Sequence, residues 1–238
     1  MIGSNLDEGT EFMMLAPKLA CNATQADFKI WVEDFVGGQP DADEKVLKLY
    51  DPRNLTRPLP DCQGRSYYGP PARKYSGEQA SYFNAAMRVA GDASVVCPVY
   101  SLADAAKGRV FVYDFKLTPS YSVNFGDTST MGAFHGAEVP FVFGADFELI
   151  TKAERQLSSA ISCFWKSFAR HGDPGTAGCA GGASWPAFKA LDSIVMKLDA
   201  SLGSAPLASI ARERCRVAQE MRQTHVHELP DDTDTVII

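Results

Sequence analysis

The segment from Arg109 to Leu117, RVFVYDFKL, constrains the fold more than any other part of the chain. β-Branched and aromatic residues fill it, and its apolar positions fall on both faces of an extended backbone. A strand with two apolar faces belongs in a sheet that helices cover on both sides. This segment therefore predicts a central strand of an α/β protein.

Helical periodicity dominates much of the remaining chain. Apolar faces predict helices near residues 28–36, 46–50, 83–90, 96–103 and 207–222. The clearest helix begins at a capping box formed by Thr151 and Glu154 and ends near His171. Gly91 lies between two of these helical faces, and Ser76 with Gln79 forms another capping-box pattern.

A second strand is predicted at Ile194–Leu198. Strands that alternate with helices indicate the α/β class. Two clear strands are few for 238 residues, which fits part of a larger sheet better than a complete domain. The Gly- and Pro-rich stretches of the chain are short, so no internal domain boundary is drawn.

Composition narrows the function classes. A net charge of -6 argues against binding to nucleic acid, and no apolar run reaches the roughly 20 residues that span a membrane. The spacing of Cys and His suggests neither a metal site nor a cofactor, and the pair His225 and His227 is a weak exception. The first residues lack a signal peptide and resemble the end of a strand, so we expect Met1 to be internal to a longer protein.

Six cysteines and two glycosylation sequons point to an oxidising compartment. The sequons begin at Asn22 and Asn54, and an even cysteine count suits disulfides, whose pairing many combinations could satisfy. Together they favour a secreted or extracellular protein. The oligomeric state cannot be read from this pattern.

Three segments carry a family resemblance. Residues 3–10, GSNLDEGT, look like the segment of type-B carboxylesterases (the cholinesterase-like family) that holds the acid of the catalytic triad. Residues 134–144, FHGAEVPFVFG, are similar to the segment that holds the catalytic histidine. Residues 164–174, FWKSFARHGDP, with Trp185 and Pro186 downstream, resemble the helix and turn that follow.

The resemblance implies an α/β-hydrolase fold, of which residues 1–238 would be the C-terminal part, an incomplete central sheet flanked by helices. It also implies that Glu8 and His135 are the acid and the base of a Ser-His-Glu triad acting on a small-molecule ester. Residues 228–238 are expected to form a disordered acidic tail. Without the resemblance, Glu8 reads as a turn residue and His135 as an exposed or structural histidine.

The nucleophile of such a triad is absent from the sequence. No GxSxG occurs in the chain, and no HGGG-type segment offers an oxyanion hole. Because these groups supply most of the catalysis, we expect the chain alone to be inactive and the parent protein to be the esterase. Glu138, three residues after His135, is expected to make a structural hydrogen bond.

The same resemblance implies one disulfide. The segments around Cys97 and Cys215 are similar to two family landmarks, each of which holds one half of a bridge. The pairing of the other four cysteines stays open, with Cys21–Cys62 and Cys163–Cys179 as the candidates that remain.

A non-catalytic role is the alternative. The family fold also occurs in catalytically dead relatives such as neuroligins and thyroglobulin, which act in adhesion or as structural domains. The presence of both Glu8 and His135 favours the enzyme, because an adhesion module has no chemical need for the pair. The sequence upstream of Met1 would discriminate between the two.

Overall fold

The computed structural model describes residues 1–15, 19–37, 40–63, 73–121, 128–145, 148–175, 179, 183–189, 194–207 and 209–226. Its main sheet has four strands in the order β1-β4-β5-β6. The strands are β1 (Ile2–Asn5), β4 (Val112–Phe115), β5 (Ile194–Leu198) and β6 (Gly203–Pro206). The first three are parallel to one another, and β6 runs antiparallel to β5.

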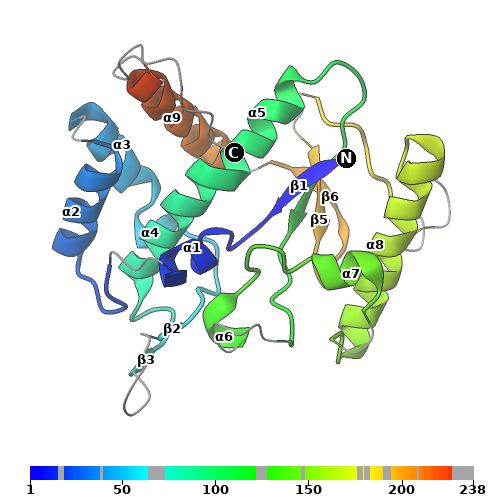
Figure 1. Ribbon diagram of the computed structural model, residues 1–238, viewed down its shortest axis with the longest axis horizontal. Helices are drawn as coiled ribbons and strands as arrows, with labels where there is room; N and C mark the ends of the chain where they lie inside the picture. Colours follow the sequence, from blue (N-terminus) through cyan, green and yellow to red (C-terminus); the bar gives the residue numbers. More distant parts are fainter. Residues whose placement is uncertain are drawn as a thin grey trace, which may run out of the picture.

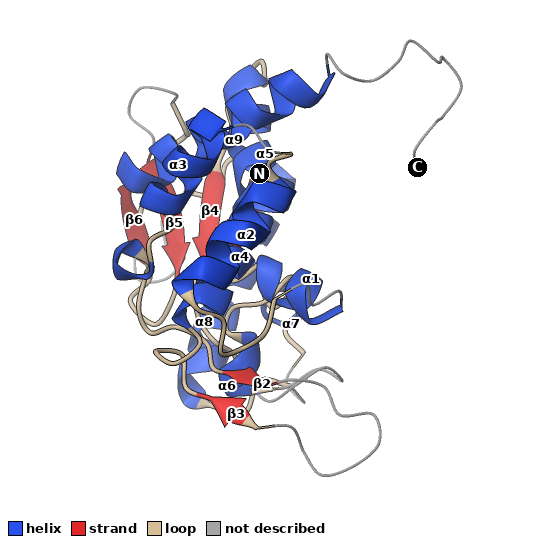
Figure 2. Cartoon of the chain, turned by 90° about the vertical axis from the view of Figure 1, so that its left-hand side faces the viewer, coloured by secondary structure: helices blue, strands red, loops and turns tan. Residues whose placement is uncertain are grey.

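Helices cover both faces of this sheet, as Figure 1 shows. On one side lie α4 (Ser81–Gly91), α5 (Cys97–Ala105) and α9 (Ser209–Val226), and on the other lie α7 (Val139–Phe143) and α8 (Lys152–His171). The remaining helical elements are α1 (Gly9–Leu15), α2 (Gln25–Phe35), α3 (Pro40–Leu49), η1 (Pro52–Asn54), η2 (Asp92–Val96) and α6 (Thr128–Met131). Figure 2 shows that the small ribbon of β2 (Cys62–Gln63) and β3 (Lys74–Tyr75) lies away from the main sheet.

The central strand separates two cores, as its sequence predicts. Phe111 and Phe115 are fully buried on the side of α7 and α8, whereas Val112 is fully buried on the side of α4 and α5. The alternation follows from the two-residue period of a strand. The paired part of β4, Val112–Phe115, is shorter than the predicted strand Arg109–Leu117. The mixed α/β architecture with a mostly parallel sheet is confirmed. This architecture is consistent with part of an α/β-hydrolase fold.

Helix α8 and strand β5 agree closely with the sequence prediction. Thr151 is the N-cap of α8 and exchanges both capping-box hydrogen bonds with Glu154, and Gly172 ends the helix at φ 67°. The pair Ser76 and Gln79 also exchanges hydrogen bonds, but α4 begins later, at Ser81.

Helix α4 ends at Gly91, between the two helical faces that the sequence predicts. The chain continues without a break from α4 through the π-helical turn η2 into α5. A Cβ atom at Gly91 would lie 2.7 Å from the backbone nitrogen of Gly9. The missing side chain of Gly91 therefore allows the close approach of α1 to α4.

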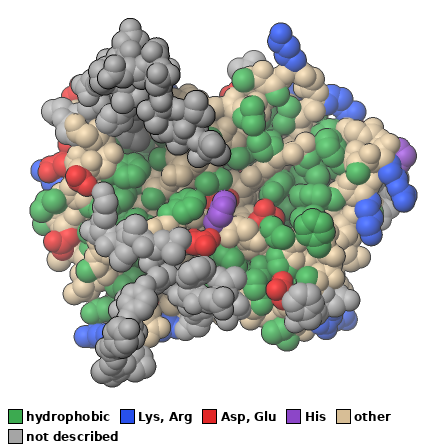
Figure 3. All heavy atoms as spheres, viewed as in Figure 1, with side chains coloured by type: hydrophobic (Ala, Val, Ile, Leu, Met, Phe, Trp, Pro, Cys, Tyr) green, Lys and Arg blue, Asp and Glu red, His purple; other side chains and the backbone are tan. Residues whose placement is uncertain are grey.

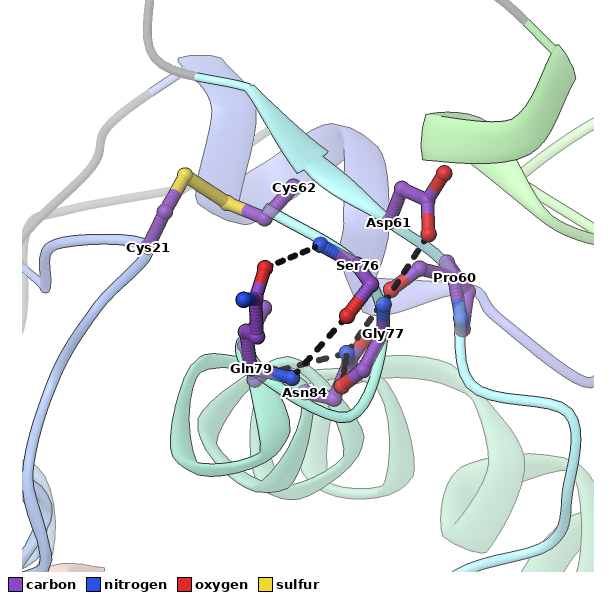
Figure 4. Close-up of a disulfide and its surroundings, with 9 residues drawn as sticks. Cys21, Pro60, Asp61, Cys62, Ser76, Gly77, Gln79 and Asn84 are labelled. Atoms are coloured by element: carbon purple, nitrogen blue, oxygen red, sulfur yellow. Dashed lines mark hydrogen bonds between the residues drawn. A yellow bond between two sulfur atoms is a disulfide. The ribbon is translucent and has the colours of Figure 1, made fainter. Parts of the chain in front are cut away.

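Three disulfides link the described elements. Cys97 and Cys215 are bonded, with 4.9 Å between their Cα atoms, so the pairing that the resemblance implies is confirmed. Cys163 is bonded to Cys179, and Cys21 to Cys62, the bond drawn in Figure 4. No helix in the described ranges is long and apolar enough to cross a membrane. The expected tail at residues 228–238 and the ring of His227 lie outside the described residues.

Candidate active site

Glu8 lies in a buried turn directly after the first strand. Strand β1 ends at Asn5, and helix α1 begins at Gly9. Only 4% of the Glu8 residue is exposed, and its Oε1 accepts a hydrogen bond from the Asn5 backbone N–H at 2.6 Å. Burial raises the pKa of the Glu8 carboxyl above its ordinary value, although the Asn5 N–H and the His135 ring each oppose that rise.

His135 follows the short helix α6 and lies beside this carboxylate. Its Nδ1 is 2.6 Å from Oε2 of Glu8, across 127 positions of sequence. The imidazole is 51% exposed, whereas Phe134 before it and Ala137 after it are buried. Glu8 and His135, which the sequence predicts as partners, therefore form a hydrogen-bonded pair in which Glu8 is buried and the His135 ring is half-exposed.

A buried ion pair between Asp7 and Arg88 fixes the acid segment against helix α4. Asp7, next to Glu8, lies 2.7 Å from the Arg88 guanidinium, and both side chains are about 5% exposed or less. The other oxygen of Asp7 accepts the backbone N–H of Ala133 at 2.8 Å, and the Asp7 N–H donates to the Ala133 carbonyl. Asp7 thus connects the acid segment to helix α4 and to the histidine segment.

Two glycines let these segments approach. A Cβ atom at Gly132 would lie 2.4 Å from Oδ2 of Asp7, and one at Gly9 would lie 1.9 Å from the Met87 carbonyl oxygen. Gly132 also has a φ of 61°, which favours glycine. Any larger residue at Gly9 would push the acid segment away from α4.

Asn5 and Glu138 complete the surroundings of the pair. The Asn5 side-chain amide donates to the Phe134 carbonyl at 2.7 Å and to Glu138 at 2.6 Å. The Tyr113 hydroxyl donates to the other oxygen of Glu138 at 3.3 Å. Glu138 therefore makes the structural hydrogen bonds expected of it.

The sequence reasoning did not identify Asn5, Asp7 or Arg88 as functional. One signal was available for Arg88, because a lone cation among the apolar residues of 83–90 is a sign of a buried, paired charge. Asp7 and Asn5 carry no such signal, since polar residues next to a turn are usually solvated. Their partners are 81 to 133 positions away in the chain.

The surface around His135 is partly apolar. The ring of Phe12 lies 5.5 Å from the imidazole, centroid to centroid. Val139 and Phe143 of α7, the helix that follows His135 in the chain, are 47% and 81% exposed. Figure 3 shows this face, with a histidine in its middle between hydrophobic and acidic side chains. Within the described part of the chain, Nε2 of His135 has no hydrogen-bond partner, so it can take a proton from a group that approaches this face.

Other predicted sites lie away from this pair. Asn22 is exposed, and so is Asn54, whose amide donates to the Lys48 carbonyl at 3.1 Å. Glycosylation of either residue stays a prediction. Among the described residues, no group of three His, Cys, Asp or Glu side chains could hold a metal ion.

Comparison with known proteins places the chain in a family. The family model described as "Carboxylesterase family" matches residues 1–227. Acetylcholinesterase of Gallus gallus is 38% identical over 106 residues, which cover 42% of this chain and 13% of that protein. Cocaine esterase of Homo sapiens is 34% identical over 103 residues, covering 41% and 18%, and acetylcholinesterase of Bungarus fasciatus is 33% identical over 133 residues, covering 54% and 21%.

These alignments each cover less than a quarter of the relative's own length. The matched family model nevertheless spans nearly all of this chain, including the two segments that hold Glu8 and His135. The chain belongs to the carboxylesterase family.

Proposed function

We propose that this chain is the C-terminal part of a serine carboxylic-ester hydrolase and supplies the acid and the base of a Ser-His-Glu triad. The observation that carries the proposal is the 2.6 Å contact between the buried Glu8 carboxylate and Nδ1 of the half-exposed His135. The nucleophile would come from residues outside these 238, because no GxSxG occurs among them.

Each member of the pair has a defined task in this mechanism. Nε2 of His135 takes the proton of the serine hydroxyl as the hydroxyl attacks the ester carbonyl, and later gives it to the leaving alcohol. Glu8 accepts the hydrogen bond of Nδ1–H, which keeps the imidazole in the tautomer whose Nε2 is free to accept a proton. The carboxylate also stabilises the imidazolium that forms.

The burial of Glu8 suits this role. A carboxylate that water cannot reach has a stronger electrostatic interaction with the imidazolium than a solvated one would have. The Asn5 N–H holds the second carboxylate oxygen, so the acid cannot rotate away from the ring. An adhesion or structural domain has no chemical need for a buried acid aligned with an open histidine, which favours the enzyme over the non-catalytic alternative.

The substrate class and the location extend the same proposal. The Phe12 ring, 5.5 Å from the imidazole, suits an ester with an apolar part. Three disulfides and two sequons favour an extracellular protein or one of the secretory pathway.

The test is hydrolysis of a p-nitrophenyl ester. The purified 238-residue chain should show no turnover above the uncatalysed rate, since it has neither nucleophile nor oxyanion hole. Turnover by this chain that His135→Ala abolishes would contradict that part of the proposal.

In a longer form of the protein that contains a GxSxG segment, His135→Ala and Glu8→Gln should each reduce kcat by about ten-thousand-fold or more. His171→Ala is the matched control, because His171 is an exposed histidine at the end of α8. Full activity of the longer form after His135→Ala would overturn the triad assignment.

A further inference from the structure

Asn5 forms hydrogen bonds to Glu8 and to the residue that precedes His135. Its backbone N–H donates to Oε1 of Glu8 at 2.6 Å. Its side-chain Nδ2 donates to the carbonyl oxygen of Phe134, the residue before His135, at 2.7 Å. One residue therefore holds the carboxylate with its main chain and the backbone that carries the imidazole with its side chain.

From this geometry we infer that Asn5 is the positioning residue of the pair and sets the distance and the tautomer of His135 relative to Glu8. The inference rests on the proposed function. It assigns to Asn5 no contact with a substrate and no part in proton transfer.

The position of Asn5 is itself rigid. It is the last residue of β1, in register with Phe115 of β4, and it is 2% exposed. The backbone N–H of Leu6 donates to the Phe115 carbonyl at 2.9 Å, so the strand pairing continues one residue beyond it. A shift of Asn5 would require the sheet to move. The acid segment and the histidine segment, which Asn5 connects, are therefore held in place by the sheet.

The chemistry of the contacts selects an amide. Nδ2 faces two acceptors, the Phe134 carbonyl and the Glu138 carboxylate at 2.6 Å, and only an NH₂ group provides two hydrogens on one small side chain. Aspartate provides none when ionised, and serine provides one. The carbonyl oxygen of the amide is buried with no partner in the described ranges, so the two bonds of the nitrogen orient the side chain.

Glu138 extends the connection to the central strand. It accepts hydrogen bonds from Asn5 on one oxygen and from the Tyr113 hydroxyl on the other. Its negative charge also contributes to the raised pKa of Glu8. With an acceptor at position 5 in place of the donor, the Glu138 carboxylate would repel the side chain and release the Phe134 backbone.

The experiment is ¹⁵N NMR of the imidazole rings in the 238-residue chain at a pH where histidine is neutral. The wild-type His135 should show the Nδ1–H tautomer, assigned through His135→Ala. In Asn5→Ala and Asn5→Asp the ring shifts should move toward a mixture of the two tautomers. The exposed His171 provides an internal reference whose shifts stay the same in every variant.

Asn84→Ala is the matched control. Asn84 is also a buried asparagine, 1% exposed, and its Nδ2 donates to the backbone carbonyls of Pro60, Gly77 and Ala80, far along the chain from the pair. Figure 4 shows Asn84 with Pro60 and Gly77, in the surroundings of the Cys21–Cys62 bridge. The control should lose stability as Asn5→Ala does but keep the Nδ1–H tautomer of His135.

The outcomes are distinct. A His135 tautomer that is unchanged in Asn5→Ala and Asn5→Asp would overturn the positioning role while leaving the proposed function intact. A wild-type ring that lacks the Nδ1–H tautomer would overturn the positioning role as well as the pair. A longer form without His135-dependent turnover would overturn the function but not the role of Asn5. If Asn5→Ala does not fold, Asn5→Ser removes one of the two hydrogens at smaller loss of volume, and the same shift is expected of it.

Discussion

The acid segment and the histidine segment face each other, but they are built differently. Asp7, Glu8 and Thr10 are all less than 5% exposed, and an ion pair and a glycine contact hold them against α4. In the second segment, Ala133 and Phe134 are buried as deeply, yet the His135 side chain is 51% exposed and the Phe143 residue is 81% exposed. The Glu8 carboxylate is therefore held in place by the packing of the domain, whereas the His135 ring is exposed to any group that binds this face.

The largest loss of stability is expected from breaking the buried ion pair between Asp7 and Arg88. Asp7→Ala would leave the Arg88 guanidinium and the Ala133 N–H buried without their partner. We expect a loss of about 3–5 kcal/mol in the free energy of unfolding, measured by urea denaturation. Glu213→Ala, which removes an exposed ion pair of similar length on α9, should have a much smaller effect because water screens that pair. Equal losses in the two variants would show that burial does not distinguish the acid segment.

A smaller loss is expected where α1 approaches α4. Gly9→Ala places a methyl group 1.9 Å from the Met87 carbonyl oxygen, so the backbone must shift. The expected cost is about 1–3 kcal/mol in thermal or urea unfolding. Gly203→Ala is the control, since a Cβ atom there meets no other atom within 4 Å. A neutral Gly9→Ala would mean that the acid segment tolerates displacement.

Truncation of the His135 side chain should have little effect on the free energy of unfolding. His135→Ala removes one hydrogen bond from Glu8, but water can reach the place of a ring that is half exposed. We expect at most about 1 kcal/mol of lost stability by the same denaturation assay. A loss of stability as large as that of Asp7→Ala would contradict the idea that the exposed His135 ring contributes little to packing.

The smallest effect should appear only as a dependence on pH. Because burial raises the folded-state pKa of Glu8, the native state binds more protons at this carboxyl than the unfolded state does. Its contribution to stability is therefore highest below the ordinary glutamate pKa of about 4.3 and falls as the pH rises through the folded-state pKa. Glu8→Gln lacks this titration.

The measurement is the free energy of unfolding of wild type and Glu8→Gln from about pH 4 to pH 7, a range that starts near the ordinary glutamate pKa. The stability of the wild type relative to the variant should decrease across this range. A relative stability that increases with pH would mean that the pKa of Glu8 is lowered on folding, as in a solvated acid paired with a cation.

Local patterns proved sufficient for the elements that are stabilised locally. The capping box of Thr151 and Glu154 and the short, mostly apolar run of β5 each contain their own signal, and both elements occur as predicted. Strand β6, of sequence GSAP, escaped prediction because small residues and a proline give no alternation, and only pairing with β5 makes it a strand.

Longer-range contacts explain the remaining differences. Gly91 has the residue type of a helix end, but its contact with Gly9 is visible only once the two helices are in place. Glu8 and His135 were recognisable through a family resemblance and not through their own residue types. Asn5 and Asp7 act through partners across the fold, which no local pattern can indicate.

The disulfide between Cys97 and Cys215 has a consequence for proteolysis. It closes a covalent ring over a sequence separation of 118 residues, and that ring includes His135. A single backbone cut between residues 98 and 214 would open the ring without dividing the molecule, so the two pieces would migrate as one on a non-reducing gel and separate only after reduction. Even a cut between the acid and the base within this stretch would leave both on the same covalent molecule.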